Sequence, residues 1–402
     1  MSQSKPMPQT QSKLPSGASE LQNVGASHRR KHVLYLPSTP LNILLSFAHA
    51  AAHGEQQDSV MVIIDQPNRE QHPYLNSLHA LAERAESPFI SVEVLCAKQA
   101  NMSRLKLRQQ NFSRLTEIMD TYQFEAVAVG SDRRIEFQFC MHYLQQFFKE
   151  STKNKLNKQV EGWYLDDGLY SYMGNRKPWY ENLTNRLIKK ITYGTWWQEP
   201  ITVGASNWIQ QAWLFDPCNA VLELKNKTLH KIDKTWFREA AIEKLANELF
   251  LQSGVSDEFD WFKADLCILL PHPNNIKKMP GYAERLNGLL DSTKSLPIHV
   301  AVKYHPRTEQ LDALGLAQKY RVSIIPSSIA FEFVLMKLSN HTKLIGDVGS
   351  ALLTAKWLRP EIASVAVFDA ANSFENKFKS VLTVHGVQVQ SVEQDLMEWL
   401  DA

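Results

Sequence analysis

The stretch HVLYLPSTPLNILLSFAHAAAHGEQQDSVMVII, residues 32–64, decides the fold class. Its pattern predicts a buried strand at His32–Leu36 and a proline turn at 37–40. A helix at Leu41–His53, which ends at Gly54, and a second buried strand at Val60–Ile64 follow. Strands that alternate with helices form a parallel sheet that is covered on both faces. These residues therefore predict an α/β protein.

The same alternation continues along the chain and restarts after a middle part that is rich in Trp. Before this part we predict strands at Phe89–Leu95, Glu125–Val129 and Gly162–Leu165 and a helix at Ser103–Tyr122. The part 175–260 has few clear strands and one helical pattern, at Thr235–Gln252. After it the pattern predicts strands at Asp265–Leu270, Ile298–Lys303, Val322–Ile325, Lys343–Ile345 and Ser364–Phe368. Helices are predicted at Gly281–Leu290, 308–319, 329–339, 349–358 and Val392–Leu400.

This order predicts two Rossmann-like domains after a disordered, weakly basic tail at 1–30. The N-terminal domain is expected at 31–255, including the Trp-rich part, and the C-terminal domain at 256–402. In one arrangement the closing helix packs back on the N-terminal domain. The carboxyl ends of both sheets are expected to face a central cleft, where open α/β sheets bind ligands.

Length and composition agree with two soluble domains. The chain has 402 residues, 44% of them hydrophobic, and its 44 Lys and Arg nearly balance its 42 Asp and Glu. A net charge of +2 does not favour a dedicated nucleic-acid binder. No stretch is apolar enough for a membrane span, and residues 1–31 lack the apolar segment of a signal peptide. The four cysteines are far apart without a Cys-x-x-Cys pair, which predicts free thiols in a reducing cytoplasm.

An acidic turn follows the strand predicted at Gly162–Leu165. In Asp166-Asp167-Gly168 either carboxylate could be a general base, or the pair could simply form a tight turn. Adjacent extended residues point to opposite faces, so at most one carboxylate can point into the cleft while the other supports the turn. Gly168 would permit a positive φ and the close approach of a substrate.

Two His-Pro pairs end strands of the second half. In Lys303-Tyr304-His305-Pro306-Arg307 an extended chain would place Lys303, His305 and Arg307 on one face, as an anion site for a phosphate. The alternative is a solvated edge strand. His272-Pro273 also follows a strand, so His272 is a secondary cleft candidate.

Other candidates lie where predicted strands lead into helices. Gly349 and Ser350 begin a helix and could bind a phosphate, or could be ordinary capping residues. Glu332 could accept a hydrogen bond from a ribose hydroxyl, or merely complement a helix dipole. Further cleft candidates, at the ends of N-terminal strands, are Ser38, Ser131 and Asp132.

Together these motifs resemble the bacterial sialyltransferases, including capsular polysialyltransferases and lipooligosaccharide sialyltransferases. The family pattern of two acidic residues and Gly, His-Pro, and a Ser pair is matched by Asp166-Asp167-Gly168, His305-Pro306 and Gly349-Ser350. Ser350 is followed by Ala351, so the Ser pair is incomplete. The resemblance covers roughly 31–370 and implies a GT-B-like fold of two Rossmann-like domains.

The resemblance also implies a reaction. A CMP-activated sugar acid would be the donor, a glycan or glycolipid the acceptor, and transfer would invert the anomeric centre without a metal or other cofactor. Asp167 would be the base, with Asp166 as its alternative or support. His305 and Ser350 would stabilise the leaving phosphate, which Lys303, Pro306 and Arg307 adjoin, and Glu332 would contact the nucleotide.

Several alternatives stay open. The sugar could be Kdo or another nonulosonic acid, the chain could be a non-catalytic glycan- or nucleotide-binding assembly subunit, or it could be a UDP-sugar enzyme such as a non-hydrolysing epimerase. Basic residues from Lys149 to Lys190, interleaved with Trp179, Tyr180 and Trp196, are either wet surface or a peripheral contact with an anionic membrane. The expected location is the cytoplasm, in the second case at the inner face of the cytoplasmic membrane.

Overall fold

The computed structural model describes residues 29–66, 78, 87–99, 101–151, 159–174, 183–238, 240–252, 260–276, 279–369, 372–391 and 399–400. The tail predicted at 1–30 lies almost entirely outside the described residues, as do Trp179, Tyr180 and most of the helix predicted at Val392–Leu400.

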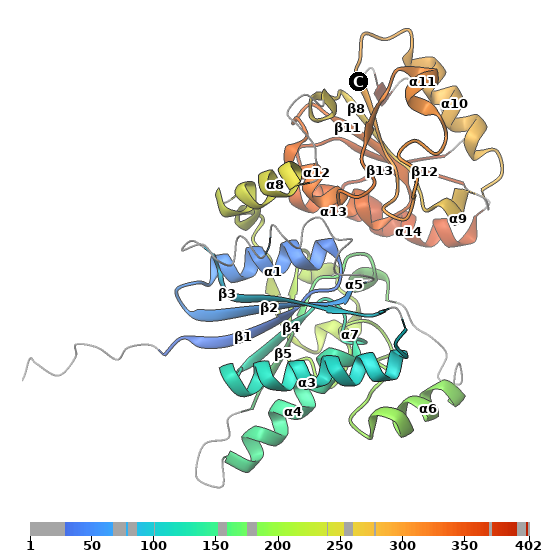
Figure 1. Cartoon of the computed structure of the whole chain (residues 1–402). Helices are drawn as coiled ribbons and strands as arrows, with labels where there is room; N and C mark the ends of the chain where they lie inside the picture. Colours follow the sequence, from blue (N-terminus) through green and yellow to red (C-terminus); the bar gives the residue numbers. More distant parts are fainter. Residues whose placement is uncertain are drawn as a thin grey trace, which may run out of the picture.

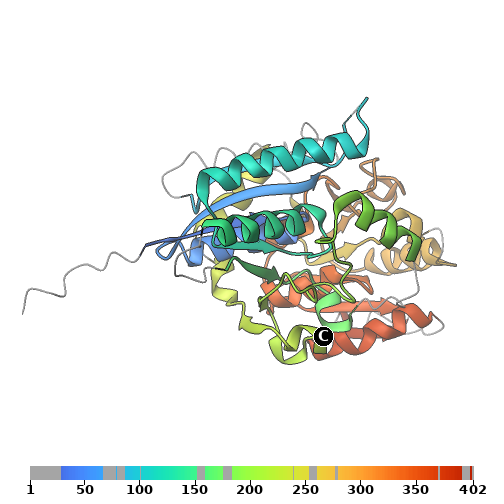
Figure 2. The same ribbon diagram turned by 90° about the horizontal axis from the view of Figure 1, so that it is seen from below.

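Parallel strands form the sheet of the first domain, in the order β3-β2-β1-β4-β5-β6-β7. Figure 1 labels β1 to β5 of this sheet. Side chains of β1 alternate between its faces, so that Val33 and Tyr35 pack on the side of α1 while Leu34 and Leu36 pack on the side of α3 and α4. Both views show α3 alongside the strands (Figure 1, Figure 2). These elements are β1 (Lys31–Leu36), β2 (Gln57–Gln66), β3 (Phe89–Cys96), β4 (Ala126–Val129), β5 (Glu161–Leu165), β6 (Gln211–Leu214), β7 (Thr228–Lys231), α1 (Pro40–Ala52), α3 (Arg104–Tyr122) and α4 (Ile135–Ser151).

The second domain has a sheet of the same kind, with parallel strands in the order β10-β9-β8-β11-β12-β13. Leu266 and Ile268 of β8 face the core formed with α10, whereas Cys267 and Leu269 face the core formed with α12 and α13. The elements are β8 (Leu266–Leu269), β9 (Val300–Lys303), β10 (Ser323–Ile325), β11 (Lys343–Asp347), β12 (Ser364–Phe368), β13 (Gln388–Ser391), α9 (Pro273–Ile276), α10 (Tyr282–Thr293), α11 (Leu316–Tyr320), α12 (Phe331–Lys337), α13 (Ser350–Leu358) and α14 (Ser373–Val384).

Short elements join the two sheets and surround the first one. They are α5 (Tyr170–Met173), α6 (Leu183–Tyr193), η2 (Pro217–Asn219), α7 (Leu222–Lys225), η3 (Lys234–Arg238), α8 (Ala240–Gln252) and η4 (Asp260–Lys263).

The structure differs from the predicted elements mainly where strands are short. The Trp-rich part supplies β6 and β7, whose four residues each are too few for a clear period. The polar strand β13 and α14 were not predicted, and the helix expected at 308–319 is reduced to α11. At the chain end, Lys343 donates hydrogen bonds to the carbonyl oxygens of Trp399 and Leu400. These residues therefore pack on the second domain and not on the first.

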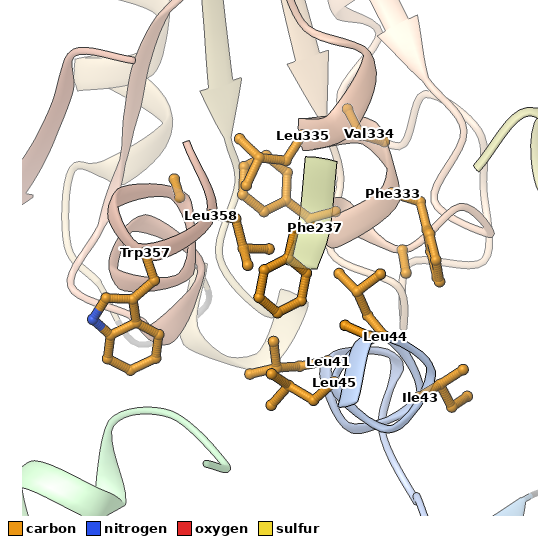
Figure 3. Packing of buried hydrophobic residues seen from close by; sticks show 14 of the residues in the cluster. Leu41, Ile43, Leu44, Leu45, Phe237, Phe333, Val334, Leu335, Trp357 and Leu358 are labelled. Atoms are coloured by element: carbon orange, nitrogen blue, oxygen red, sulfur yellow. The ribbon is translucent and has the colours of Figure 1, made fainter. Parts of the chain in front are cut away.

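Helix α1 lies between the two domains and is buried from Leu41 to Ala50. Its leucines point toward Phe237 of η3 and the side chains of α12 and α13 (Figure 3). The rings of Phe215 and Trp357 stack across the same interface with centroids 4.6 Å apart. One continuous apolar core therefore joins the domains and fixes how their loops meet.

Candidate active site

The acidic turn after β5 divides its two carboxylates between different roles. Asp166 is fully buried, and one of its oxygens accepts hydrogen bonds from the Gly168 amide at 3.0 Å and the Ser171 hydroxyl at 2.7 Å. Its other oxygen accepts from the Tyr172 hydroxyl and from the Phe215 amide at 3.1 Å. Burial raises the pKa of Asp166 to about 6. With both of its oxygens occupied, this carboxylate holds the turn.

Asp167 has fewer partners and a more suitable protonation equilibrium. Its Oδ1 accepts one side-chain hydrogen bond, from the Asn42 amide at 3.2 Å. Burial raises the pKa of Asp167 to about 7, while Asn42 and the nearby Arg134 oppose the rise. A carboxylate with a pKa near the working pH is suited to accept a proton from a substrate hydroxyl.

Asn42 is a site residue that the sequence analysis missed. It lies in the first turn of α1, where its side chain passes directly over Gly130 at the end of β4. A Cβ on Gly130 would lie 2.2 Å from three Asn42 side-chain atoms, so only glycine leaves room for this amide. An amide side chain in the first turn of a largely apolar helix was the signal that could have found it.

Gly168 brings the acidic turn against the second domain. Its φ of +95° is a conformation that glycine adopts readily. A Cβ built on Gly168 would lie 3.7 Å from the Cβ of Ser350, the first residue of α13. The exposed Ser350 and its N-cap Gly349 thus meet the turn that carries Asp167. Two motifs that are far apart in the sequence are adjacent in the fold.

The two His-Pro pairs form one cluster at the ends of neighbouring strands. The rings of His272, after β8, and His305, after β9, have centroids 4.8 Å apart. The Nδ1 atom of each accepts the backbone N–H two residues later, from Asn274 at 3.0 Å and from Arg307 at 3.1 Å. In the neutral rings the proton is therefore on Nε2, and each ring can donate one hydrogen bond from that atom.

His305 is neutral in this environment. Burial, together with His272, Arg307 and Lys303, lowers the pKa of His305 to about 4. A bound phosphate dianion would favour the protonated form and raise this pKa again. The ring is thus prepared to donate a hydrogen bond to developing negative charge without carrying a positive charge in the free protein.

The expected single-face row of Lys303, His305 and Arg307 is wrong. Strand β9 ends at Lys303 and a turn follows at Pro306 and Arg307, so the extended alternation does not continue. The Lys303 ammonium is buried and donates to the carbonyl oxygens of Tyr304 at 2.9 Å and Ser327 at 3.3 Å. Burial lowers its pKa to about 8. Lys303 therefore ties the His305 loop to the loop before α12, while Pro306 and Arg307 are exposed.

Two further carboxyls lie on the second-domain side. Glu332, in the first turn of α12, is half-buried; burial raises its pKa and Lys303 opposes the rise. Asp347, at the end of β11, was not among the predicted site residues. Burial and the neighbouring Glu375 raise the pKa of Asp347 to about 7, so this group is partly protonated near neutral pH.

The remaining candidates lie around the end of β4. Asp132 is fully buried, and its oxygens accept the amides of Gly204 at 2.8 Å and Ser206 at 2.7 Å. It therefore anchors a loop, which corrects its assignment as a cleft residue. Ser131, like Ser38 after β1, is half-buried. Arg134 pairs with Asp65 at the end of β2 and also acts on Asp167 electrostatically.

No group of three His, Cys, Asp or Glu side chains within the described ranges has the arrangement of a metal site. What the described site offers is the Asp167 carboxyl, with a pKa near neutrality, opposed across the domain boundary by the beginning of a helix, with two imidazole donors at the ends of β8 and β9. Such a set can accept a proton from one group and stabilise an anion on another.

Neither a protein-family model nor a curated protein sequence matches the chain. Solved structures do. An α/β-galactoside α-2,3-sialyltransferase from the luminous marine bacterium Photobacterium phosphoreum is 12% identical over 90% of this chain and 99% of that chain, with a TM-score of 0.55. The fold is GT-B. A UDP-GlcNAc 2-epimerase from Methanocaldococcus jannaschii is 12% identical over 92% of this chain and 91% of that chain, with a TM-score of 0.52. The predicted arrangement of two parallel-sheet domains is confirmed.

Proposed function

We propose that the chain is a glycosyltransferase that moves sialic acid or a related nonulosonic acid from a CMP-sugar to a surface-glycan acceptor. The observation that carries the proposal is the approach of the Asp167 turn to the start of α13, marked by Gly168 and Ser350. This places a candidate base in one domain against a candidate phosphate site in the other.

In the proposed reaction an acceptor hydroxyl gives its proton to Asp167. The hydroxyl oxygen bonds to the anomeric carbon of the donor as the bond from that carbon to the CMP oxygen breaks, and CMP leaves with the bonding electrons. Attack from the face opposite the leaving group inverts the anomeric centre. His305 would donate from Nε2 to the phosphate as its charge grows, and Ser350 with the first amides of α13 would contribute further donors.

Two assignments extend this proposal to the nucleotide and to metal. Glu332 would accept hydrogen bonds from the ribose hydroxyls, because its carboxylate lies in the first turn of α12 and interacts electrostatically with Lys303, two residues before His305. Fixed donors at the leaving phosphate would do what a divalent cation does in other transferases, so activity should survive excess EDTA. An absolute requirement for Mg²⁺ or Mn²⁺ would contradict this part of the proposal.

The second candidate is a UDP-sugar enzyme, which the likeness to a UDP-GlcNAc 2-epimerase fold favours. A thermal-shift titration with CMP, CDP and UDP separates the two, since the transferase should be stabilised by CMP. A chain stabilised by CMP without transferring sugar would instead be a binding subunit of an assembly.

The decisive experiment incubates the chain with CMP-sialic acid, CMP-Kdo and an acceptor panel and identifies products by mass spectrometry. Wild type should transfer one of these sugars, and Asp167→Asn should bind CMP as wild type does but transfer nothing. Wild-type rates in Asp167→Asn would refute its role as base, and loss in Asp166→Asn alone would exchange the two assignments.

A further inference from the structure

Helix α6, Leu183–Tyr193, has no buried residue. Its large apolar side chains are strongly exposed, with Leu187 at 61% and Ile191 at 76% of their surface accessible. A helix on a soluble domain normally buries its apolar face against the core, and a concentrated exposed apolar face marks an interaction site. The others exposed on this helix are Leu183 and Ile188.

The apolar residues of α6 form one stripe. Leu183, Leu187 and Ile191 recur every four residues and so lie on one side of the helix, with Ile188 next to them. The helix also carries Arg186, Lys189 and Lys190 and has no Asp or Glu. An apolar stripe on a helix whose charged residues are all basic is typical of helices that lie in an anionic lipid surface.

Contacts on the basic side hold α6 to the protein. The Lys189 ammonium lies 5.0 Å from the centre of the Trp197 ring, and Arg186 lies 3.8 Å from Glu199. At the helix end the Tyr193 hydroxyl accepts a hydrogen bond from Arg108 of α3 at 2.9 Å. The basic side is therefore turned toward the loop that follows, which leaves the apolar stripe directed outward.

This loop connects α6 to the edge of the sheet where the acidic turn lies. Asp132, just after β4, accepts the amides of Gly204 and Ser206 and so anchors the far end of the loop. Strand β4 pairs with β5, whose end carries Asp167. Figures 1 and 2 both show α6 on the outside of the molecule.

We propose that α6 docks the protein on an anionic lipid surface. Leu183, Leu187 and Ile191 would insert below the lipid headgroups, and the Lys190 ammonium would lie among the headgroups. None of the described helices has the length and hydropathy to cross a membrane. Docking through α6 would hold the acceptor side of the site near the lipid. Resting on the proposed function, this identifies the acceptor as a glycan carried on a lipid.

Vesicle co-sedimentation of the full chain tests the docking. Wild type should pellet with vesicles of phosphatidylglycerol and phosphatidylethanolamine, and much less with phosphatidylcholine alone. Leu187→Asp and Ile191→Asp should each lower the partition coefficient at least about tenfold, the effect expected when one large apolar side chain no longer inserts. Lys190→Gln should weaken binding and flatten its salt dependence. The matched control is Leu222→Asp on α7, since Leu222 is also 67% exposed but lies off this stripe.

Wild type that fails to pellet, or a control that loses as much binding as Leu187→Asp, would overturn the proposal. So would light scattering that shows wild type as a dimer and Leu187→Asp as a monomer, with equal vesicle binding, because the stripe would then join two copies. Thermal melts check that the variants fold. The rate of sugar transfer to a water-soluble acceptor should be the same in Leu187→Asp as in wild type. If neither wild type nor any variant transfers sugar, the proposed function is refuted, and the docking result stands independently of it.

Discussion

Gly130 is the residue whose replacement should show most directly how the site is held. In Gly130→Ala the new Cβ would lie 2.2 Å from the Asn42 side chain, where ordinary contacts begin near 3.4 Å. Asn42 would have to retreat by about 1 Å, but α1 is packed between the domains and every residue from Leu41 to Ala50 is buried. Overpacking of this kind typically costs about 1–3 kcal/mol of unfolding free energy.

The consequence for the site follows from the same displacement. An Asn42 that moves loses its hydrogen bond to Asp167, which opposes the rise in the pKa of that carboxyl. Gly130→Ala should therefore raise the pKa of Asp167 and shift the acid limb of the pH–rate profile to higher pH. Asn42→Ala should shift the profile in the same direction.

A double-mutant cycle measured by urea unfolding isolates the clash. Asn42→Ala removes all three atoms that the new methyl group would meet, so Gly130→Ala should cost almost nothing in the Asn42→Ala background. The expected coupling is about 1–3 kcal/mol. Strict additivity of the two single variants would refute the reasoning, because it would mean that the new methyl group and the Asn42 side chain do not compete for the same space.

Three further outcomes are expected. The pKa of Asp167 in the folded protein, about 7, exceeds its ordinary value of 3.8, so the folded state binds more protons than the unfolded state between these two pH values. The stability that this group contributes is therefore lost as the pH rises from about 4 to about 7. Asp167→Asn should remove this part of the dependence of the unfolding free energy on pH, measured by urea titrations, and an unchanged dependence would contradict the assignment. In steady-state assays His305→Ala should lower kcat by about 10²–10³-fold with a smaller effect on KM, and His272→Ala should also lower kcat. His341 is exposed, so His341→Ala should have the activity of wild type. Wild-type kcat in His305→Ala would remove this ring from the mechanism. Gly168→Ala should lose about 1–2 kcal/mol in thermal unfolding because of its positive φ, and an unchanged melt would show that the turn tolerates a Cβ there.

The sequence alone determined the class of the fold and the places where chemistry could occur. Hydrophobic periodicity and the proline and glycine residues that end helices and strands are local properties of the sequence. The strands and the helix of residues 32–64 therefore follow from their own residues and match β1, α1 and the core of β2. Because parallel strands present their carboxyl ends at one edge, the loops after β5, β9 and β11 were identifiable as candidates. Very short strands such as β6 were not predicted from the sequence, because their hydrogen-bonded neighbours, and not their hydrophobic periodicity, define them.

Which candidates meet was decided by the tertiary structure. Strand order makes β8 and β9 neighbours and so pairs His272 with His305. The packing of α1 on the first sheet sets Asn42 over Gly130, and the packing of the two domains sets the Gly168 turn against Ser350. The turn after β9 sends the Lys303 ammonium to backbone carbonyls, although an extended chain would have aligned it with His305. Side-chain direction depends on backbone torsions and on neighbours distant in sequence, and for these residues both are fixed only when the sheets and the domains have packed.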